Sequence, residues 1–306
     1  MTADAAALTW TDALTGDVRT MTREALDREL SPSRFVDSLD AELAVYASRS
    51  AAARDAAAQR GRLREGLRYG ESPGASLDLL SPSSSGPAPL LIYVHGGFWQ
   101  QLSRRESAFA GAGIVARGGA LAAVGYTLAP EASLTQIVAE VRQAIRFLRR
   151  QAGELGLDRD RFVIAGSSAG AHLAAMALAE DDEALPQDAL HGACLVSGVY
   201  DLRAVRHSYV NDVAGIRDDE EEPLSPARRP RAVRCPVLLA VGEHEPDEFK
   251  REMALYGRTL ARAGALIRPV QIAGRHHFDV ILDLDRRGTF LGHATLAMLG
   301  LLQGED

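Results

Sequence analysis

The stretch VIAGSSAGAHL, residues 163–173, places two serines between two glycines, after an apolar run and before an alanine-rich one. Its centre fits the pattern G-x-S-x-G with Ser168 in the middle, in the order strand, turn, helix that this pattern needs. Such a turn strains the backbone of its central residue and holds that side chain at the edge of the sheet, near the first amides of the helix. The stretch therefore predicts a serine nucleophile, the alternative being a serine-rich turn without chemistry. Ser167 is expected to point away from the edge and to serve packing.

The wider pattern predicts an α/β fold. Short apolar runs recur between helical stretches, and in residues 134–148 apolar side chains three and four apart define one helix face. The predicted strands cover residues 77–80, 90–94, 120–124, 162–165, 193–196, 237–241 and 267–272. Buried strands that alternate with helices indicate a mostly parallel sheet covered on both faces. We interpret residues 1–306 as a single domain, with a helical N-terminal extension over residues 1–70 and a cap-like insertion over residues 202–234.

Composition limits the classes of function. The chain has 306 residues, a formal net charge of −7 and no basic stripe, which argues against nucleic acid as the main partner. Its two cysteines, Cys194 and Cys235, lie in or beside apolar runs and are expected to be buried free thiols. We find no signal-peptide pattern, no apolar run long enough to span a bilayer, and no HExxH or spaced cysteine–histidine set for a metal. We therefore expect a cytoplasmic protein without a metal, membrane or nucleic-acid partner.

A second motif supports the enzymatic interpretation of the turn. The sequence HGGFWQ, residues 95–100, directly follows a predicted strand. The backbone N–H groups of Gly96 and Gly97, together with that of Ala169, can form an oxyanion hole for a carbonyl oxygen that gains negative charge. The alternative for the glycine pair is an ordinary loop. The two motifs in this order, each after a strand, favour a hydrolytic site.

A serine nucleophile needs a basic imidazole and an acid that orients it. On a hydrolase sheet the chain order is serine, acid, histidine. Among the later histidines, His276 and His277 follow the last predicted strand within a short loop, and we favour His277 because an amphipathic stretch follows it. The acid candidates Glu245 and Asp247 both lie in the loop after the preceding predicted strand. His172, one helical turn after the serine, is expected to be a packed residue and not the base.

Several motifs together carry a family resemblance. They are SPSRFV at residues 31–36, HGGFWQ, SAGAHLAA at residues 168–175, LVSGVYDL at residues 195–202, and the pair His277–Phe278. These resemble SPSRWV, HGGYWQ, SAGAHLAA, LVSGVFDL and the HF pair of the arylformamidases, also called kynurenine formamidases, in the α/β-hydrolase superfamily. The resemblance runs nearly from end to end of the chain, and HGGFWQ together with SAGAHLAA is more particular than the superfamily-wide HGG and GxSxG.

The resemblance implies an α/β-hydrolase fold and hydrolysis of an N-formyl arylamide, with N-formyl-L-kynurenine giving kynurenine and formate. It implies a Ser168–acid–His277 triad that works through a formyl-enzyme intermediate, without a cofactor. It also points to a small-molecule partner and a homodimer. Phe98 and Trp99 are then candidates to stack on the aryl ring, although Phe98 equally suits core packing. The alternative function is that of a carboxylesterase for small aryl or short-acyl esters.

Three positions depart from the family pattern. The family's G-x-x-D-S-P-E-F, aligned on Glu248–Phe249, places its aspartate at Glu245, so we favour Glu245 over Asp247 as the acid. Either carboxylate can orient an imidazole. Ser167 stands where the family has histidine, and Phe98 where it has tyrosine. These changes bear on the substrate more than on the chemistry.

Overall fold

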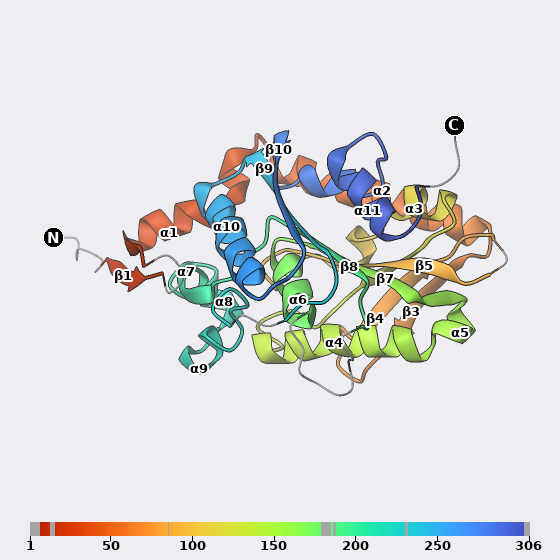
Figure 1. Ribbon diagram of the computed structural model, residues 1–306, viewed down its shortest axis with the longest axis horizontal. Helices are drawn as coiled ribbons and strands as arrows, with labels where there is room; N and C mark the ends of the chain where they lie inside the picture. Colours follow the sequence, from red (N-terminus) through yellow and green to blue (C-terminus); the bar gives the residue numbers. More distant parts are fainter. Residues whose placement is uncertain are drawn as a thin grey trace.

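The computed structural model describes residues 7–12, 16–84, 86–178, 185, 188–229 and 232–302. Its centre is an eight-stranded sheet in the order β10-β9-β8-β7-β5-β6-β4-β3 (Figure 1). The strands are β3 (Leu63–Arg68), β4 (Ser76–Leu80), β5 (Ala88–Val94), β6 (Ala120–Val124), β7 (Leu157–Ser167), β8 (Gly192–Val196), β9 (Val237–His244) and β10 (Ile267–His276). All neighbours from β10 to β6 pair in parallel, whereas β4 and β3 add antiparallel pairs at one edge. The predicted mostly parallel sheet is confirmed, and each predicted strand coincides with an observed one.

Helices cover both faces of the sheet (Figure 1). One face carries α4 (Leu134–Arg150), α6 (Ala169–Leu178) and α10 (Asp247–Arg262), and the other carries α2 (Leu39–Gln59), α3 (Gly111–Ala116) and α11 (Phe290–Met298). Strand β5 shows how the sequence serves both layers. Leu90 and Ile92 join the first core and Leu91 and Tyr93 the second, because successive side chains of a strand point to opposite faces. A continuous apolar run is therefore the expected pattern for such a strand.

Helix α4 begins where its sequence provides a cap. The Ser133 side chain accepts a hydrogen bond from the Gln136 N–H, and the Gln136 side chain accepts one from the Ser133 N–H at 2.8 Å. This reciprocal pair satisfies two backbone donors that the first turn would otherwise leave without partners. From this start, the predicted apolar face is buried against the sheet. The four-residue helix α5 (Ala152–Leu155) then leads into β7.

The N-terminal part differs from the expected helical extension. Residues 23–59 do contain helices, namely α1 (Arg23–Glu29), the 3₁₀ turn η1 (Pro32–Phe35) and α2. However, β1 (Leu8–Thr11) and β2 (Val18–Met21) form an antiparallel hairpin, and β3 joins the central sheet. The β-branched and aromatic residues of β1 and β2 suit strands. In β3 the pairing with β4 outweighs the helix propensity of Leu, Arg and Glu. Residues 1–6 and 13–15 lie outside the described residues.

The segment between β8 and β9, interpreted above as a cap-like insertion, contains three short helices among its described residues. They are α7 (Leu202–Arg206), α8 (Asn211–Ala214) and α9 (Asp218–Glu221). Its Tyr209 and Val210 line a pocket at the carboxyl ends of the strands. The 3₁₀ turns η2 (Arg104–Glu106) and η3 (Val280–Asp283) complete the regular structure. Both cysteines are buried and free, as expected.

Asp78 of β4 forms a buried ionic cluster that provides a stability test. Its fully buried carboxylate pairs with Arg54 of α2, with Arg104 at 3.0 Å, and with the Gly66 N–H at 2.8 Å. Removing one partner of a buried ion pair leaves an uncompensated charge. We expect Asp78→Asn to lower the free energy of unfolding in urea by about 3–5 kcal/mol.

The matched control for this test is Asp158→Asn. The Asp158 carboxylate pairs with Arg161 at 3.5 Å and accepts from the Asp160 N–H at 3.0 Å, and the two ion-paired side chains remain partly open to solvent. An exposed pair of this kind contributes about 0–1 kcal/mol. Equal losses of stability in the two variants would show that the buried cluster does not anchor α2 to the sheet.

Candidate active site

Ser168 occupies a strained turn between β7 and α6. Its φ is +56°, in the left-handed region, and its N–H donates to the Val196 carbonyl of β8 at 2.9 Å. The flanking glycines have no room for a side chain: a Cβ on Gly166 would overlap the Gly170 backbone, and a Cβ on Gly170 would overlap the Val94 carbonyl. The turn thus has the geometry that the sequence predicts, and α6 begins with Ala169 directly after Ser168.

His277 follows β10 and makes the hydrogen bond that a catalytic imidazole needs. Its Nδ1 lies 2.7 Å from Oε2 of Glu245, and both side chains are almost fully buried. With a carboxylate acceptor, Nδ1 carries the proton and donates it, which leaves Nε2 with a lone pair. The ring packs against Phe249 with centroids 4.6 Å apart. His277 is therefore held in the tautomer that suits a general base at Nε2.

The other candidates from the sequence lie apart from this pair. The Asp247 carboxylate is 93% exposed and pairs with Lys250 of its own helix at 3.3 Å. His276 accepts hydrogen bonds at Nδ1 from the N–H groups of Phe278 and Asp279, so it shapes the loop. The structure thus brings Glu245, and not Asp247, to the imidazole.

His172, the third candidate histidine, also lies away from the reacting groups. Its Nε2 donates to the Leu224 carbonyl at 2.8 Å. Burial lowers the pKa of His172 to about 4, so the ring is neutral. Its place inside the fold agrees with the expected packing role.

In the glycine loop after β5, two carbonyl groups have hydrogen-bond partners inside the fold. These partners set the direction in which the N–H groups of the loop point. The Tyr126 hydroxyl donates to the His95 carbonyl at 3.0 Å, and Nδ1 of His95 donates to the Gly96 carbonyl at 3.0 Å. In a trans peptide the N–H points opposite to the C=O, so the Gly96 and Gly97 N–H groups point away from these buried partners. A Cβ on Gly96 would lie 3.2 Å from Cβ of Ser168, which places the loop directly against the turn. Burial lowers the pKa of His95 to about 4 and keeps its ring neutral.

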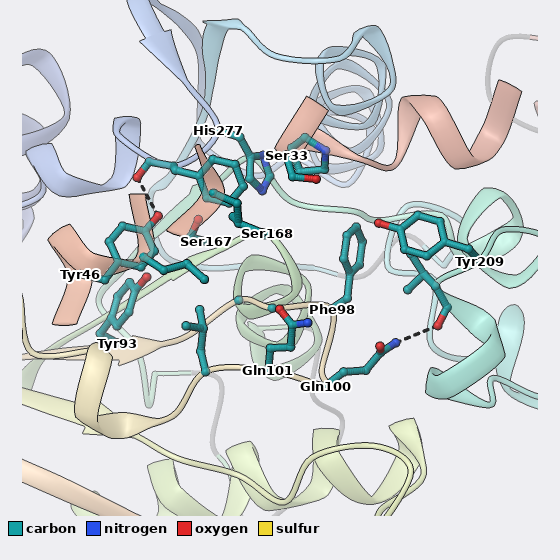
Figure 2. Close-up of a pocket in the computed structure, with 18 residues that line it drawn as sticks. Ser33, Tyr46, Tyr93, Phe98, Gln100, Gln101, Ser167, Ser168, Tyr209 and His277 are labelled. Carbon is teal, nitrogen blue, oxygen red and sulfur yellow. Dashed lines mark hydrogen bonds between the residues drawn. The ribbon is translucent and has the colours of Figure 1, made fainter. Parts of the chain in front are cut away.

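Ser168 and His277 line one pocket together with both loop glycines (Figure 2). The pocket walls come from η1, α2, the loop after β5 and the segment after α7, and they include Pro32, Ser33, Leu43, Tyr46, Tyr93, Phe98, Gln100, Gln101, Tyr209 and Val210. Among the described residues that line it, none is Asp, Glu, Lys or Arg. A cavity of about 150 Å³ can hold one benzene molecule, so the 170 Å³ of this pocket suits a ligand with a single ring.

Several known proteins are similar to this chain in sequence or in fold. A family model described as BD-FAE matches residues 77–218. The kynurenine formamidase of Danio rerio is 32% identical over 93% of this chain and 99% of its own length, and that of Salmo salar is 30% identical over 92% and 97%. The chain belongs to the kynurenine formamidase family. The thermostable carboxylesterase EstE1, from a metagenomic library, has a similar fold, with a TM-score of 0.66 and 21% identity over 83% of this chain and 98% of its own.

Membership of the kynurenine formamidase family confirms the resemblance predicted from the motifs, and the α/β-hydrolase fold and the hydrolase class are confirmed with it. Among the described residues, no three histidine, cysteine or acidic side chains gather to hold a metal ion. In the same part of the chain, no helix combines the length and the apolar composition needed to cross a membrane.

Of the two predicted substrate contacts, Phe98 and Trp99, one lies in the pocket and the other in the core. Phe98 lines the pocket (Figure 2). Trp99 does not: it is 1% exposed and its ring meets that of His172 edge-on at 5.2 Å, so it packs behind the loop. Ser167, expected to point away, lines the pocket as well. The left-handed backbone at Ser168 breaks the alternation of a regular strand, so the two neighbouring serines reach the same side.

Two tyrosines that line the pocket were not predicted from the sequence. Tyr46 of α2 donates from its hydroxyl to the Phe278 carbonyl at 2.6 Å, which ties this helix to the loop of His277. Tyr93 lies two residues before the glycine loop and is 3% exposed. Burial raises the pKa of both phenols, so both remain protonated donors at neutral pH. A polar hydroxyl within the apolar run of β5 was the signal available for Tyr93, whereas α2 is too far away in the sequence to have suggested Tyr46.

Proposed function

We propose that this chain hydrolyses N-formyl arylamides, with N-formyl-L-kynurenine as substrate and kynurenine and formate as products. The observation that supports this proposal is the hydrogen bond between Glu245 and His277, which lies at the same pocket as Ser168. The chain also belongs to the kynurenine formamidase family. An amide carbonyl needs a strong nucleophile and a site for the oxyanion, and both are available at the strained turn.

In the first half of the reaction His277 Nε2 takes the proton of the Ser168 hydroxyl, and Oγ forms a bond to the formyl carbon. The carbonyl oxygen becomes an oxyanion that accepts hydrogen bonds from the N–H groups of Gly96, Gly97 and Ala169. The imidazolium, stabilised by the Glu245 carboxylate, then protonates the aryl nitrogen, and the C–N bond breaks. The arylamine leaves, and a formyl ester remains on Ser168.

In the second half a water molecule replaces the arylamine. His277 takes one proton from this water, whose oxygen bonds to the formyl carbon. The same amides hold the second oxyanion. Collapse breaks the ester bond, the proton returns to Oγ of Ser168, and formate leaves. The cycle consumes one water and needs no redox step or cofactor.

Because the transferred formyl group is small, selectivity must come from the aryl side. The 170 Å³ pocket with Phe98, Tyr46 and Tyr93 in its walls suits one aromatic ring. Among the described residues of the pocket walls, none is Asp, Glu, Lys or Arg. The walls therefore offer no ion pair to the ammonium or carboxylate group of an amino acid. The formyl-bearing ring therefore occupies the pocket, and the aminocarboxyl group of N-formylkynurenine extends toward its mouth.

A carboxylesterase acting on small aryl or short-acyl esters is the second candidate. Phe98 and Ser167, both in the pocket, depart from the family pattern and favour this alternative because they change the walls near the substrate. The same nucleophile, base and amides would cleave an ester, whose leaving oxygen needs less help from a proton.

Product analysis separates the two functions. We expect the purified protein to release kynurenine and formate in equal amounts from N-formylkynurenine, with a kcat/KM above that for nitrophenyl acetate. The measurement is chromatography of kynurenine together with an enzymatic formate assay. Ester cleavage without any release of formate from the formamide would exclude the first function and leave the second.

We propose that the protein is a homodimer in solution, as the family resemblance implies. Light scattering on the purified protein measures the oligomeric state.

A further inference from the structure

Ser197 directly follows β8 at the junction between the nucleophile turn and the acid loop. It is fully buried and has a φ of +52°. Its N–H donates to the Ala240 carbonyl of β9 at 2.7 Å, while the carbonyl of its neighbour Val196 accepts from the Ser168 N–H at 2.9 Å. Two consecutive residues therefore connect the strand of the nucleophile to the strand that leads to Glu245. A serine in the left-handed region costs free energy, and such strain persists where the surroundings enforce it.

The Ser197 hydroxyl makes its hydrogen bond within this junction. It donates to Oε1 of Glu245 at 2.6 Å, and the Gly242 N–H donates to the same oxygen at 2.6 Å. The other carboxylate oxygen, Oε2, accepts from Nδ1 of His277 at 2.7 Å. A Cβ on Gly242 would overlap the Arg275 carbonyl oxygen at 2.5 Å and would also lie 3.1 Å from Oε1, so the glycine makes room for both the neighbouring strand and the carboxylate. All three donors are buried. Two of them bind Oε1 and the third binds Oε2, so both carboxylate oxygens have partners.

This arrangement restrains the flexible glutamate side chain at the acid position. Glutamate has one more rotatable bond than the aspartate of the family pattern, so a free carboxylate could turn its oxygens away from the imidazole. Two donors on Oε1 fix the rotation of the carboxylate plane and leave Oε2 to face His277. Hydrogen bonds to a charged acceptor are short and directional, as these are.

We propose that Ser197 is a positioning residue that acts through Glu245, holding its longer side chain in the orientation that supports His277. This assignment deepens the proposed function and rests on its triad. Ser197 does not line the pocket, so it touches neither the substrate nor the reacting atoms. Its contribution belongs to the chemical step and not to substrate binding.

The test is Ser197→Gly, measured with N-formylkynurenine and with a fluorophosphonate that modifies the active serine. Glycine accepts the left-handed backbone without strain, which offsets part of the stability lost with the hydrogen bond, so we expect the variant to fold with only a modest fall in melting temperature. Loss of one hydrogen bond to a buried charged group should lower kcat about 10- to 100-fold. KM should change less than about threefold, and the fluorophosphonate labelling rate should fall by the same factor as kcat.

Two controls separate positioning from a general loss of packing. Ser107→Ala removes another buried hydroxyl, which donates to the Ser103 carbonyl at 2.6 Å, and it should leave kcat and labelling unchanged. In a Glu245→Ala background no carboxylate remains for Ser197 to position, so Ser197→Gly should add less than about a threefold loss. Labelling rates permit this comparison even where turnover is slow.

The outcomes are distinct. A wild-type kcat in Ser197→Gly, a rise in KM alone, or an equal loss in the Glu245→Ala background would overturn the positioning role. If the wild type is labelled at Ser168 but releases no formate, the formamide function fails while the labelling comparison still decides the role of Ser197. Absence of labelling in the wild type would overturn the triad and the role of Ser197 together.

Discussion

Ser168→Ala is expected to lower kcat for N-formylkynurenine by about 10⁴- to 10⁶-fold while the fold remains intact. The substitution removes the oxygen that we propose attacks the formyl carbon, and the proposed oxyanion-hole amides would then only bind the substrate and polarise it. Alanine differs from serine by one oxygen and has the same Cβ, so the strained φ of +56° costs about the same in both proteins. Turnover assays and thermal unfolding of the purified variant give the two readouts.

Ser167→Ala is the matched control because both serines line the pocket. Ser167 ends β7, whereas Ser168 occupies the left-handed position of the turn, against which the Gly96 loop packs. We expect Ser167→Ala to change kcat less than about tenfold, through the shape of the pocket alone. A fluorophosphonate should label the wild type and Ser167→Ala, but not Ser168→Ala. A larger loss in Ser167→Ala than in Ser168→Ala would move the nucleophile to position 167.

The parts of the fold that the sequence predicts well are those in which local pattern and tertiary environment agree. Strand β6 (Ala120–Val124) is buried on both faces, and its continuous apolar run reflects this directly. Strand β3 (Leu63–Arg68) contains leucine, arginine and glutamate, which are good helix formers, and only its pairing with β4 makes it a strand. The local sequence of residues 63–68 does not predict the pairing with β4.

The same contrast holds in the active site. Ser168 and the glycine loop carry sequence motifs because close backbone contacts demand particular small residues there. Spacing alone could not decide between Glu245 and Asp247, which lie two residues apart in one loop. The choice depends on Gly242 and Ser197, whose donors reach Oε1 of Glu245 only in the folded chain. The pocket wall from α2 likewise depends on long-range packing, so Tyr46 carried no local signal.

Glu245→Gln and Asp247→Asn are expected to differ by about three orders of magnitude or more in kcat. Loss of the negative charge at the acid of a serine triad typically lowers kcat about 10⁴-fold. Asp247 is 93% exposed at the start of α10 and pairs only with Lys250 among the contacts given by the structure, so Asp247→Asn should change kcat less than about twofold. Both substitutions keep the side-chain volume, which isolates the effect of charge and hydrogen bonding.

The reason for the large loss in Glu245→Gln is that neither orientation of the amide satisfies the site. The carboxylate accepts from three donors: the Ser197 hydroxyl and the Gly242 N–H at Oε1, and His277 Nδ1 at Oε2. An amide NH₂ group toward Gly242 brings two donors together, which costs about 1–3 kcal/mol of stability. An NH₂ group toward His277 forces the proton from Nδ1 to Nε2, and the imidazole can then no longer accept the proton of Ser168.

Measured kcat values and melting temperatures of the two variants decide the acid. We expect Glu245→Gln to lose at least about three orders of magnitude in kcat and to be less stable, and Asp247→Asn to match the wild type in both respects. A greater loss in Asp247→Asn would require the loop to bring an exposed carboxylate to His277 in the substrate complex and would displace Glu245 from its role. Similar activity in both variants and the wild type would mean that the imidazole works without an acid, and the hydrogen bond of 2.7 Å to Glu245 would then be structural only.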